Sequence, residues 1–401
     1  MYNLTDKPIV LGVTGSIAAY KAPDLASKLT QAGAVVDVAM TPEATRFVAP
    51  ITFQSVTGRR AYHDMWDESS EIAELHVALA RRAELMVIAP ATATMLARLA
   101  LGLAEDLVSL TALATKAPIL VAPAMDPHMW EHPATQDHVR TLESRGVAFV
   151  GPEEGRLASG QVGTGRMSEV PVILGAIRML AGRNSDLAGK KVVVSAGGTR
   201  EAIDPVRFVG NESSGKMGFA LAEAARDRGA DVVLVAGVTA LPEPYGVRVA
   251  RVRSAAQMRD AVVAECEGAS ALIMAAAVAD YQPAEPVGEK IKRAGRDSLS
   301  LTLAPTPDIL SEVGRPQGLV KVGFAAESQD LHENARSKIA AKGLDLIVAN
   351  DITATDAGFS VDTNRVVVID ARGNEEEWPL MTKYEVAWRI LDRVRKLMGA
   401  D

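Results

Sequence analysis

The sequence is poor in cysteine, in aromatic side chains and in long apolar stretches. One cysteine, Cys266, stands among 401 residues, so an internal disulfide and a cysteine-based metal cluster are both excluded. No run of about 18 apolar residues occurs, so we expect no membrane-spanning helix. The formal net charge is −7 and the basic residues are scattered, so we expect no nucleic-acid partner. These absences are typical of a cytoplasmic protein that acts on small molecules.

What the sequence does have is an alternation of short β-branched runs with amphipathic segments. Its length of 401 residues favours two domains of about 200 residues each. Strands are predicted at Pro8–Val13, Ala34–Met40, Glu84–Ala89, Pro118–Ala122, Val147–Val150, Lys191–Ser195, Asp231–Ala236, Ser270–Ala275, Leu319–Phe324 and Leu344–Ala349. Helices are predicted at Ala18–Gln31, Ala134–Arg145, Glu169–Leu180, Lys216–Arg228, Ala255–Glu267, Leu331–Lys342 and Lys383–Met398. Apolar strands joined by helices indicate parallel sheets covered on both faces, and therefore two doubly wound α/β domains.

A polar, small-residue segment at Ala181–Lys191, AGRNSDLAGKK, separates the two halves. It follows a predicted helix whose N-cap we assign to Ser168, and it precedes a new apolar strand. We therefore place the domains at residues 1–185 and 186–401. Two segments of the second half interrupt the alternation of strands and helices, and we predict that they form β-ribbons outside the main sheet. They are Lys290–Arg293 with Ser298–Leu303, and Arg365–Asp370.

The first candidate site begins with GVTGSIAAYK at Gly12–Lys21, directly after the first strand. Gly15 and Ser16 at a strand-to-helix turn leave backbone N–H groups for a phosphate. An ordinary tight turn with Ser16 as N-cap explains the string equally well. The full dinucleotide pattern is missing, so a mononucleotide fits better.

Three further loops follow predicted strands, at the sheet edge where doubly wound folds bind ligands. They read MTPEATRF at Met40–Phe47, APATATM at Ala89–Met95 and PAMDPHMW at Pro123–Trp130. Together with ELHVALA around His76, these strings resemble the flavin-containing cysteine decarboxylase family over residues 8 to 180. The resemblance implies a flavodoxin-like or Rossmann-like domain that holds FMN noncovalently.

The resemblance also implies roles for single residues. His76 would orient the substrate or act as an acid–base group. The alternative is that His76 is a hydrogen-bonded histidine on a helix face without a catalytic role. Decarboxylation needs an electron sink, which FMN would create by oxidising the cysteine-derived thiol. The FMN contacts would come from Gly15, Ser16, Thr41, Phe53, Thr92, Thr94 and Ser109.

Two positions depart from the family's pattern. Asp126 replaces an asparagine that contacts the substrate carboxylate, and two facing carboxylates repel unless a proton or a cation intervenes. The flap LASGQVGTGRM at Leu157–Met167 carries Ser159 where the family has a proton-donating cysteine. A hydroxyl is a far weaker acid than a thiol, so the donor stays open between Ser159 as a relay, water and His76.

The second half carries another ordered set of strings. They are AGGTR at Ala196–Arg200, NESSGKMG at Asn211–Gly218, AAAVADY at Ala275–Tyr281, EKIKR at Glu289–Arg293, TPDI at Thr306–Ile309 and GFAAE at Gly323–Glu327. Each has an ordinary interpretation, such as a capped helix or an edge strand with lysines. As an ordered set they resemble the bacterial phosphopantothenate–cysteine ligase domain over about residues 190 to 395.

This resemblance implies a Rossmann-like ligase domain with 4′-phosphopantothenate, cysteine and CTP as substrates. The pantothenate carboxylate would attack the α-phosphate to give an acyl-cytidylate, and the cysteine amine would then displace CMP. Lysines and Mg²⁺ would stabilise the developing charge, although no metal ligand is assigned. Lys290 would assist the first half-reaction and Asn211 the second. The domain would form dimers within a homo-oligomer. The CTP contacts would be Ala276, Asp280, Lys290, Pro307, Asp308, Phe324, Lys338 and Lys342.

Two rival hypotheses remain at this stage. One is a ligase whose flavin domain is catalytically weakened and serves a regulatory or binding role, which Ser159 permits and the retained His76 opposes. The other is a dehydrogenase with two nucleotide domains, which PAMDPHMW and the missing dinucleotide pattern oppose. Release of CO2 by the flavin domain would separate the first rival from the bifunctional enzyme.

Overall fold

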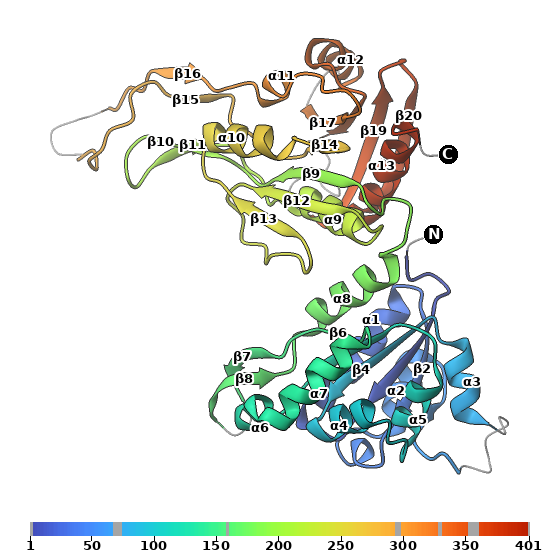
Figure 1. Cartoon of the computed structure of the whole chain (residues 1–401). Helices are drawn as coiled ribbons and strands as arrows, with labels where there is room; N and C mark the ends of the chain where they lie inside the picture. Colours follow the sequence, from blue (N-terminus) through green and yellow to red (C-terminus); the bar gives the residue numbers. More distant parts are fainter. Residues whose placement is uncertain are drawn as a thin grey trace. The chain divides into compact units, whose positions relative to one another are not determined.

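Two units follow one another along the chain, Met1–Ala181 and Gly182–Asp401 (Figure 1). The structure is a computed structural model that describes residues 3–66, 74–157, 160–292, 298–327, 331–351 and 361–399. For residues 326, 327, 331–335 and 351 it describes the backbone alone. The division lies at the start of the polar AGRNSDLAGKK segment, slightly before residue 185. Within the described ranges, no helix is both long and apolar enough to cross a membrane.

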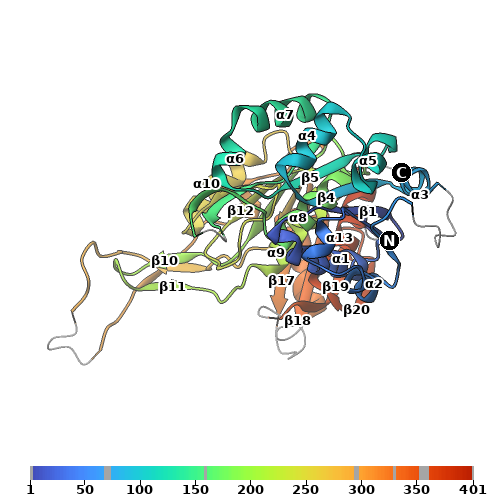
Figure 2. The ribbon, with the colours of Figure 1, turned by 90° about the horizontal axis from the view of Figure 1, so that it is seen from below.

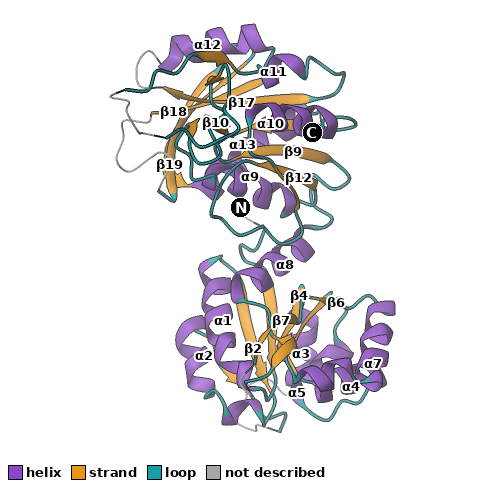
Figure 3. Ribbon diagram, turned by 90° about the vertical axis from the view of Figure 1, so that its left-hand side faces the viewer, coloured by secondary structure: helices purple, strands orange, loops and turns teal. Residues whose placement is uncertain are grey.

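The N-terminal unit is built on a six-stranded parallel sheet in the order β3-β2-β1-β4-β5-β6. Its helices lie on both faces of this sheet (Figure 3). The strands are β1 Pro8–Val13, β2 Val35–Met40, β3 Ala61–Tyr62, β4 Leu85–Ala91, β5 Ile119–Pro123 and β6 Ala148–Phe149. The helices are η1 Ile17–Lys21, α1 Ala22–Gln31, η2 Ala44–Arg46, α2 Pro50–Thr57, α3 Leu75–Arg82, α4 Ala93–Leu101, α5 Leu107–Ala114, α6 Pro127–Glu131, α7 Pro133–Ser144 and α8 Val170–Gly182.

The order of these strands decides where a ligand can bind. From β1 the chain moves outward to β2 and β3, and it then crosses back to β4 and continues to β5 and β6. Strand β4 is buried along its whole length and β1 along all but its first residue, as expected of a sheet covered on both faces. The strand order therefore reverses between β1 and β4, and this is the point at which doubly wound sheets open a crevice for ligands.

A separate antiparallel hairpin follows the sheet. It consists of β7 Glu153–Arg156 and β8 Val162–Arg166. The helix α8 begins at Val170 rather than Glu169, and Ser168 does not cap it. The Ser168 hydroxyl is buried and has no hydrogen-bond partner among the described residues, so the N-cap that we predicted there is wrong.

The C-terminal unit contains an eight-stranded sheet in the order β13-β12-β9-β14-β17-β18-β19-β20. The first six strands are parallel, and β19 and β20 run antiparallel to their neighbours. These strands are β9 Lys191–Ala196, β12 Asp231–Ala236, β13 Arg248–Arg251, β14 Ala271–Met274, β17 Val320–Glu327, β18 Leu346–Asp351, β19 Thr363–Asp370 and β20 Glu375–Thr382. The helices are α9 Lys216–Arg226, α10 Ala255–Glu265, α11 Ile309–Glu312, α12 Leu331–Lys342 and α13 Lys383–Leu397.

The same reversal of strand order recurs here, because β12 and β14 lie on opposite sides of β9. Helix α13 packs on α9 through its apolar face, which includes Val386, Ile390 and Val394. A capping box formed by Thr382 and Glu385 fixes its first turn. With the two sheets and their covering helices, the prediction of two doubly wound α/β domains is confirmed.

The β-ribbons differ from the prediction. Two small antiparallel ribbons, β10 Arg200–Ala202 with β11 Phe208–Gly210 and β15 Tyr281–Pro283 with β16 Leu303–Pro305, leave the main sheet. Both project away from the strands of their own unit (Figure 2). The backbone at 290–292 is not a strand, and residue 293 lies outside the described residues. The other predicted excursion, Arg365–Asp370, is part of β19 and belongs to the main sheet.

Candidate functional site

In the N-terminal unit, the ends of β1 and β4 are joined at the reversal of strand order. The Thr14 hydroxyl donates to the carbonyl of Pro90 at 2.8 Å and accepts from the backbone N–H of Thr92 at 3.2 Å. Thr92 in turn caps α4, because its hydroxyl accepts from the N–H of Met95 at 3.2 Å. Side chains with hydroxyl groups therefore hold the loops at the carboxyl edge of the sheet, where the sequence predicts a flavin.

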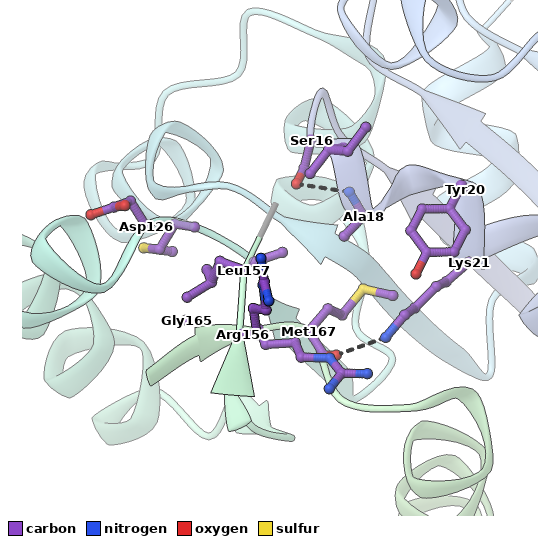
Figure 4. Close-up of a pocket in the computed structure, with 13 residues that line it drawn as sticks. Ser16, Ala18, Tyr20, Lys21, Asp126, Arg156, Leu157, Gly165 and Met167 are labelled. Atoms are coloured by element: carbon purple, nitrogen blue, oxygen red, sulfur yellow. Dashed lines mark hydrogen bonds between the residues drawn. The ribbon is translucent and has the colours of Figure 1, made fainter. Parts of the chain in front are cut away.

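A cavity of about 670 Å³ opens beside these loops. Its walls come from the turn after β1, from the loop after β5 and from the β7–β8 hairpin (Figure 4). The volume lies in the ordinary range for a small-molecule or cofactor site. The lining residues are Ser16, Ile17, Ala18, Tyr20, Lys21, Ala124, Met125, Asp126, Arg156, Leu157, Gly165, Arg166 and Met167.

The turn after β1 has a structural reason for its glycine. A Cβ atom at Gly15 would lie 2.4 Å from the Cβ of Glu43, in the loop that follows β2. Any side chain at position 15 would therefore displace this neighbouring loop. The Ser16 hydroxyl accepts from the N–H of Ala18 at 3.3 Å and caps η1, and Ser16 also lines the cavity. Both interpretations of the string, capped turn and ligand contact, are compatible with this geometry.

The flap hairpin touches the PAMDPHMW loop backbone to backbone. The N–H of Met125 donates to the carbonyl of Gly165 at 3.0 Å. A Cβ atom at Gly165 would lie 2.2 Å from the carbonyl oxygen of Met125. Only glycine permits this approach, which brings β8 against the edge of the cavity. Ser159, which the sequence places between β7 and β8, lies outside the described residues.

Asp126 lines the cavity and caps α6. Its carboxylate accepts from the N–H of His128 at 3.0 Å and lies 3.1 Å from Nδ1 of the same histidine. An asparagine could make the first of these hydrogen bonds equally well, because its carbonyl oxygen also accepts. The replacement of the family's asparagine therefore preserves the local fold and adds a negative charge to the cavity.

Three cationic side chains, Lys21, Arg156 and Arg166, line the same cavity, and Figure 4 shows Lys21 and Arg156 apart from the Asp126 carboxylate. The ammonium of Lys21 is 3.1 Å from the Glu169 carboxylate and donates to the carbonyl of Met167 at 3.2 Å. The hydrogen bond from Lys21 to the Glu169 carboxylate is the main reason why the pKa of Glu169 lies below its ordinary value, and Arg166 adds to the effect. Arg156 is exposed, and within the described ranges it makes no ion pair. It is therefore the cation of this cavity that can neutralise a further anion.

The remaining residues predicted for this unit do not line the cavity. Thr41, Phe53 and Ser109 are at most 2% exposed. The Thr41 hydroxyl accepts from the N–H of Ala44, and Ser109 completes a capping box with Asp106. Thr94 is exposed in the first turn of α4, and His76 is half-buried in the first turn of α3.

In the C-terminal unit, the loop after β14 is held at the corresponding reversal of strand order. The Ser195 hydroxyl accepts from the N–H of Ala276 at 3.1 Å, and the Thr199 hydroxyl accepts from that of Ala279 at 2.9 Å. The side-chain amide of Asn211 donates to the carbonyl of Val278 at 3.0 Å. The AGGTR, NESSGKMG and AAAVADY strings thus meet at one edge of the sheet.

Two adjoining cavities open there, of about 520 and 310 Å³. They share Asp280, Phe324 and Lys338, among other residues, and Asn211 lines the larger one. All but one of the residues predicted to contact CTP line these two cavities. The residues brought together are Ala276, Asp280, Pro307, Asp308, Phe324, Lys338 and Lys342.

The smaller cavity contains an ion pair between Asp308 and Lys342, with 3.5 Å between the carboxylate and the ammonium. Burial alone would raise the pKa of Asp308. The Ser311 hydroxyl at 2.9 Å and the charge of Lys342 outweigh it, so the pKa lies below its ordinary value. Asp308 also caps α11. The carboxylate is therefore ionised at neutral pH, and its pairing with Lys342 joins α11 to α12.

A buried lysine, Lys321, joins these two helices through hydrogen bonds. Lys321 is 1% exposed. Its ammonium donates to the carbonyls of Leu310 at 2.7 Å, Gly314 at 2.8 Å and Lys342 at 3.1 Å. All three donors of the ammonium are used, so the charge is buried without an unmet hydrogen bond. Lys321 ties the end of α11 to the end of α12 and lies outside every predicted site.

Lys290 is the exception among the predicted nucleotide residues. It is exposed and lines neither cavity. The next residue is anchored, because the N–H of Ile291 donates to the Asp204 carboxylate at 3.2 Å and Arg207 donates to the Ile291 carbonyl at 3.1 Å. The Asp204 carboxylate also accepts from the N–H groups of Val206 and Arg207, each at 2.8 Å.

Other lining residues of the larger cavity were missed by the sequence analysis. Lys383 begins α13, and Asn350 and Asn364 lie on β18 and β19. Lys383 and Asn364 are distant in sequence from the predicted strings, and a single lysine or asparagine has no periodic signal. One feature of the sequence could have drawn attention to Lys383. A lysine at the first residue of a helix is unfavourable, because its charge opposes the helix dipole.

The described parts of the chain contain no group of three or more His, Cys, Asp or Glu residues that could hold a metal ion. Mg²⁺ is seldom held by such a group of side chains alone. Such ions commonly retain several waters and bind through substrate phosphates with one or two carboxylates. Asp280 and Glu212 line the larger cavity and are the carboxylates within reach of a ligand there.

Comparison with known proteins covers nearly the whole chain. The flavoprotein family model matches residues 1–182, and the model described as DNA/pantothenate metabolism flavoprotein C-terminal domain matches residues 187–398. The coenzyme A biosynthesis bifunctional protein CoaBC of Bacillus subtilis is 44% identical over 398 residues, 98% of each chain. That of Mycolicibacterium smegmatis is 42% identical, over 98% of this chain and 99% of its own. A crystal structure of the C-terminal domain of a CoaBC covers 54% of this chain and 100% of its own, with 38% identity and a TM-score of 0.47.

Proposed function

Because the chain belongs to the family of coenzyme A biosynthesis bifunctional proteins, we propose that its two units catalyse consecutive steps. The C-terminal unit joins 4′-phosphopantothenate to cysteine at the expense of CTP. The N-terminal unit holds FMN and decarboxylates the product to 4′-phosphopantetheine. The observation that carries the proposal is the pair of adjoining cavities at the β9–β14 reversal, where seven residues predicted for CTP lie together.

The ligation proceeds in two displacements. A carboxylate oxygen of 4′-phosphopantothenate forms a bond to the α-phosphorus of CTP, and pyrophosphate leaves. The cysteine amine then forms the amide bond to the acyl carbon, CMP leaves with the bonding electron pair, and the amine loses a proton. Both transition states carry extra negative charge on oxygen, which fixed cations and amide groups stabilise.

The described residues divide these tasks between the two cavities. Phe324 offers a flat apolar surface for the base, and Asp280 and Lys338 stand at the boundary of the cavities. The Asp308–Lys342 pair closes the smaller one. Asn211 lies at the rim of the larger one, where its amide, held by the Val278 carbonyl, can polarise the acyl group. We assign Mg²⁺ to the phosphates of the nucleotide, since no carboxylate cluster is described.

The N-terminal cavity fits a flavin in volume and in donors. Its walls carry Ser16, the backbone of the turn after β1 and the cations Lys21 and Arg156. The bound FMN supplies a reversible two-electron oxidation that gives the carboxylate loss an electron sink. Ser16 would hold it from the cavity wall, and Thr92 and Thr94, which lie outside the lining, would contact it from the loop after β4, with Gly15 as the turn residue. Thr41, Phe53 and Ser109, which are buried, fix the loops behind it.

Substrate binding in this cavity depends on the charged side chains that line it. The carboxylate that is lost must approach Asp126, and two anions at close range repel. Arg156 lines the same cavity and makes no ion pair within the described ranges, so its guanidinium can neutralise the incoming carboxylate. His76 orients the substrate or exchanges a proton. Ser159 relays the final proton on a flap whose backbone is fixed at Gly165.

The ligase assignment is tested with two variants of the full chain. Lys290→Gln should abolish pyrophosphate release from 4′-phosphopantothenate and CTP, whereas Lys292→Gln, two residues away, should leave it unchanged. Asn211→Asp should accumulate the acyl-cytidylate, because the first half-reaction survives. Normal product formation by Asn211→Asp without any intermediate would disprove this division of roles.

The flavin assignment is tested by spectra and by CO2 release. The purified chain should show FMN absorbance and release CO2 when supplied with the ligation product. Ser159→Ala should release CO2 once and then retain reduced flavin if the serine relays the proton, whereas Ser159→Cys should turn over at least as fast. A chain that ligates but never releases CO2 would instead have a regulatory flavin unit.

The exposed position of Lys290 is explained by a dimer of ligase units within a homo-oligomer. The lysine lies outside the cavities of its own unit, yet its loop is anchored by Asp204. A second copy can bring this lysine to the cavity from outside. We therefore propose that the ligase site is completed by the loop of a partner subunit.

A further inference from the structure

The two departures from the decarboxylase pattern leave one chemical need of the N-terminal unit unmet, the source of the final proton. Ser159 stands where the family has a proton-donating cysteine, and Asp126 stands where it has an asparagine. Loss of CO2 consumes a proton, because a C–H bond replaces the bond to the carboxylate. A hydroxyl can pass a proton on, but it is too weak an acid to be its source. The unit therefore needs an acid outside the family's pattern.

Asp126 lines the cavity and holds a histidine beside it. Its Oδ1 accepts from the backbone N–H of His128 at 3.0 Å and lies 3.1 Å from Nδ1 of the same ring. A carboxylate oxygen only accepts, so this partner assigns the proton of the ring to Nδ1. The His128 side chain is 81% exposed, so it exchanges protons freely with water. The two side chains thus form a carboxylate–imidazole pair that links the cavity to the solvent.

The backbone around Asp126 is held by the β7–β8 hairpin. The N–H of Met125 donates to the carbonyl of Gly165 at 3.0 Å. On the other side, a Cβ atom at Gly163 would lie 2.8 Å from Cγ of Pro127. Pro127 is also the first residue of α6, where its ring fixes the backbone angle φ. The place of the Asp126 carboxylate at the cavity wall is therefore set by a fixed backbone.

A carboxylate that approaches Asp126 meets a second negative charge. Lys21 is paired with Glu169, and Figure 4 shows Lys21 and Arg156 apart from the Asp126 carboxylate. In the described part of the chain, the basic partner of Asp126 is His128. Two carboxylates at close range cannot both stay ionised without a penalty, and one shared proton removes it. Histidine changes its charge near neutral pH, so His128 can deliver this proton.

We propose that Asp126 is the acid that supplies the final proton of the decarboxylation and that His128 reloads it from the solvent. The proposal rests on the proposed function, which brings the substrate carboxylate to Asp126. Asp126 is then a catalytic residue, because it contacts the substrate. His128 does not line the cavity and acts through Asp126, so it is a positioning residue that also carries the proton.

The proton passes from His128 to Asp126 and then to the substrate. While both carboxylates are present, they share the proton donated by Nδ1. The C–C bond then breaks, CO2 leaves without the proton, and the bonding electron pair forms the C=C bond of an ene-thiolate. The O–H bond of Asp126 breaks next, the C=C pair forms a C–H bond at the α-carbon, and a sulfur electron pair forms C=S. The hydride and the thiol proton removed in the opening oxidation return to carbon and sulfur, and His128 regains a proton from water.

Asp126→Asn separates the acid from a simple contact with the substrate. The amide oxygen still accepts from the N–H of His128 and caps α6, but the amide has no proton to give. A residue that only contacts the substrate would tolerate this change to the family's own asparagine. We expect instead that the full chain, supplied with the ligation product, releases CO2 once and keeps its flavin reduced. Steady-state turnover should fall by about 100-fold. Asp126→Asn with Ser159→Cys, which restores the family's pattern, should turn over again.

His128→Gln tests the supply of protons. Glutamine keeps an N–H donor for Asp126, but it takes up no proton from water, so turnover should fall by about tenfold. Imidazole in the buffer should restore most of it, because position 128 is exposed. In the Asp126→Asn background, His128→Gln should have no further effect. His132→Asn is the matched control, since the exposed His132 caps α7 through Nδ1 and asparagine preserves that cap.

Flavin absorbance and CO2 release give the outcomes. Return of the flavin in Asp126→Asn to the oxidised state at the parent's rate overturns the proposal. Full turnover of His128→Gln, or its failure to respond to imidazole, overturns it as well. In each case CO2 release by the parent leaves the proposed decarboxylation intact. A parent that binds FMN and releases no CO2 overturns the decarboxylation, and the acid with it.

Discussion

At the scale of single residues, burial has opposite effects on two side chains of the C-terminal unit. Burial lowers the pKa of Lys383 to about 8 and raises that of the Cys266 thiol to about 11. Lys383 faces a cavity, where a change of charge can serve binding. Cys266 lies in an apolar cluster with Met258, Val262 and Leu319. The same physical cause therefore gives a responsive group in one place and an inert group in the other.

Cys266 should react very slowly in the folded protein. With a pKa of about 11, only about 0.1% of the thiol is ionised at pH 8, and the thiolate is the reactive form. Labelling with a chromogenic disulfide reagent should be at least about 100-fold slower in buffer than in guanidinium chloride. Since Cys266 is the single cysteine, the absorbance reports this residue alone. Complete labelling of the native protein within minutes would show that the thiol is accessible.

At the scale of elements, the Asp204 turn holds together two segments that are far apart in sequence. One carboxylate oxygen accepts from Val206 and Arg207, and the other accepts from Ile291. These hydrogen bonds lower the pKa of Asp204 against the opposing effect of desolvation. Stability from this group is therefore present above the ordinary carboxyl pKa, and it is lost as the pH falls through the lower folded value.

Asp204→Asn should release the Lys290 loop while preserving the turn. The amide oxygen can still accept from Val206 and Arg207, but the amide nitrogen cannot accept from Ile291. Loss of one charge-assisted hydrogen bond should reduce the rate of pyrophosphate release by roughly tenfold. CTP affinity should fall less than this rate, because the loop lines neither cavity of its own unit. Equal loss of CTP affinity would show that the turn supports the cavity itself.

Lys321→Met should separate α11 from α12. The three carbonyls that accept from the buried ammonium would lose their partner, at a cost of about 2 to 4 kcal/mol in the free energy of unfolding of this unit. CTP affinity should also fall, because Asp308 and Lys342 lie on the two helices. Calorimetry and circular dichroism follow the unfolding, and Lys396→Met serves as the control. The flavin absorbance of the other unit should not change.

The elements also show what a sequence can and cannot predict. Long apolar strands such as β1 and β12 were located to the residue, because their burial leaves a continuous apolar run. The hairpin strand β7, EEGR, was missed because it has no alternation of apolar and polar residues. A strand at 290–293 was expected from its alternating lysines, but the backbone of Ile291 pairs with Asp204 and Arg207 instead.

For the candidate site, the strings at strand ends were predicted and the distant contributions were not. Parallel strands bring their carboxyl ends to one edge, so Asn211, Asp280 and Phe324 could be expected together. Lys383 reaches the same cavity only because β18 to β20 extend the sheet and return the chain on α13. This return depends on tertiary packing, for which the sequence has no periodic signal.

At the scale of the whole molecule, each unit carries its cavity at the reversal of its own strand order. The described residues that line the first cavity belong to Met1–Ala181, and those that line the other two belong to Gly182–Asp401. On the function proposed above, the Lys290 loop of a second copy of the same unit completes the ligase cavity.

Mixing two inactive variants tests this requirement. Lys290→Gln removes the loop lysine, and Lys338→Gln damages the cavity. In a mixed dimer the intact cavity of one subunit faces the intact Lys290 of its partner, so one site is restored. Co-expression should recover about a quarter of the parent's ligase activity if subunits pair at random in a two-fold dimer. If Lys290 acts within its own chain, co-expression recovers nothing.

The two cavities of the C-terminal unit adjoin at Phe324 and Lys338, and this has a consequence for inhibitor design. A compound that fills the smaller cavity with a flat ring can extend past Phe324 and place an acidic group beside Lys216 and Lys383. Both parts of such a compound would contribute to its binding affinity, because a short rigid link loses little conformational entropy on binding. A resistance mutation at Phe324 would weaken both halves at once, but it would also damage the surface that we propose for the base of the nucleotide.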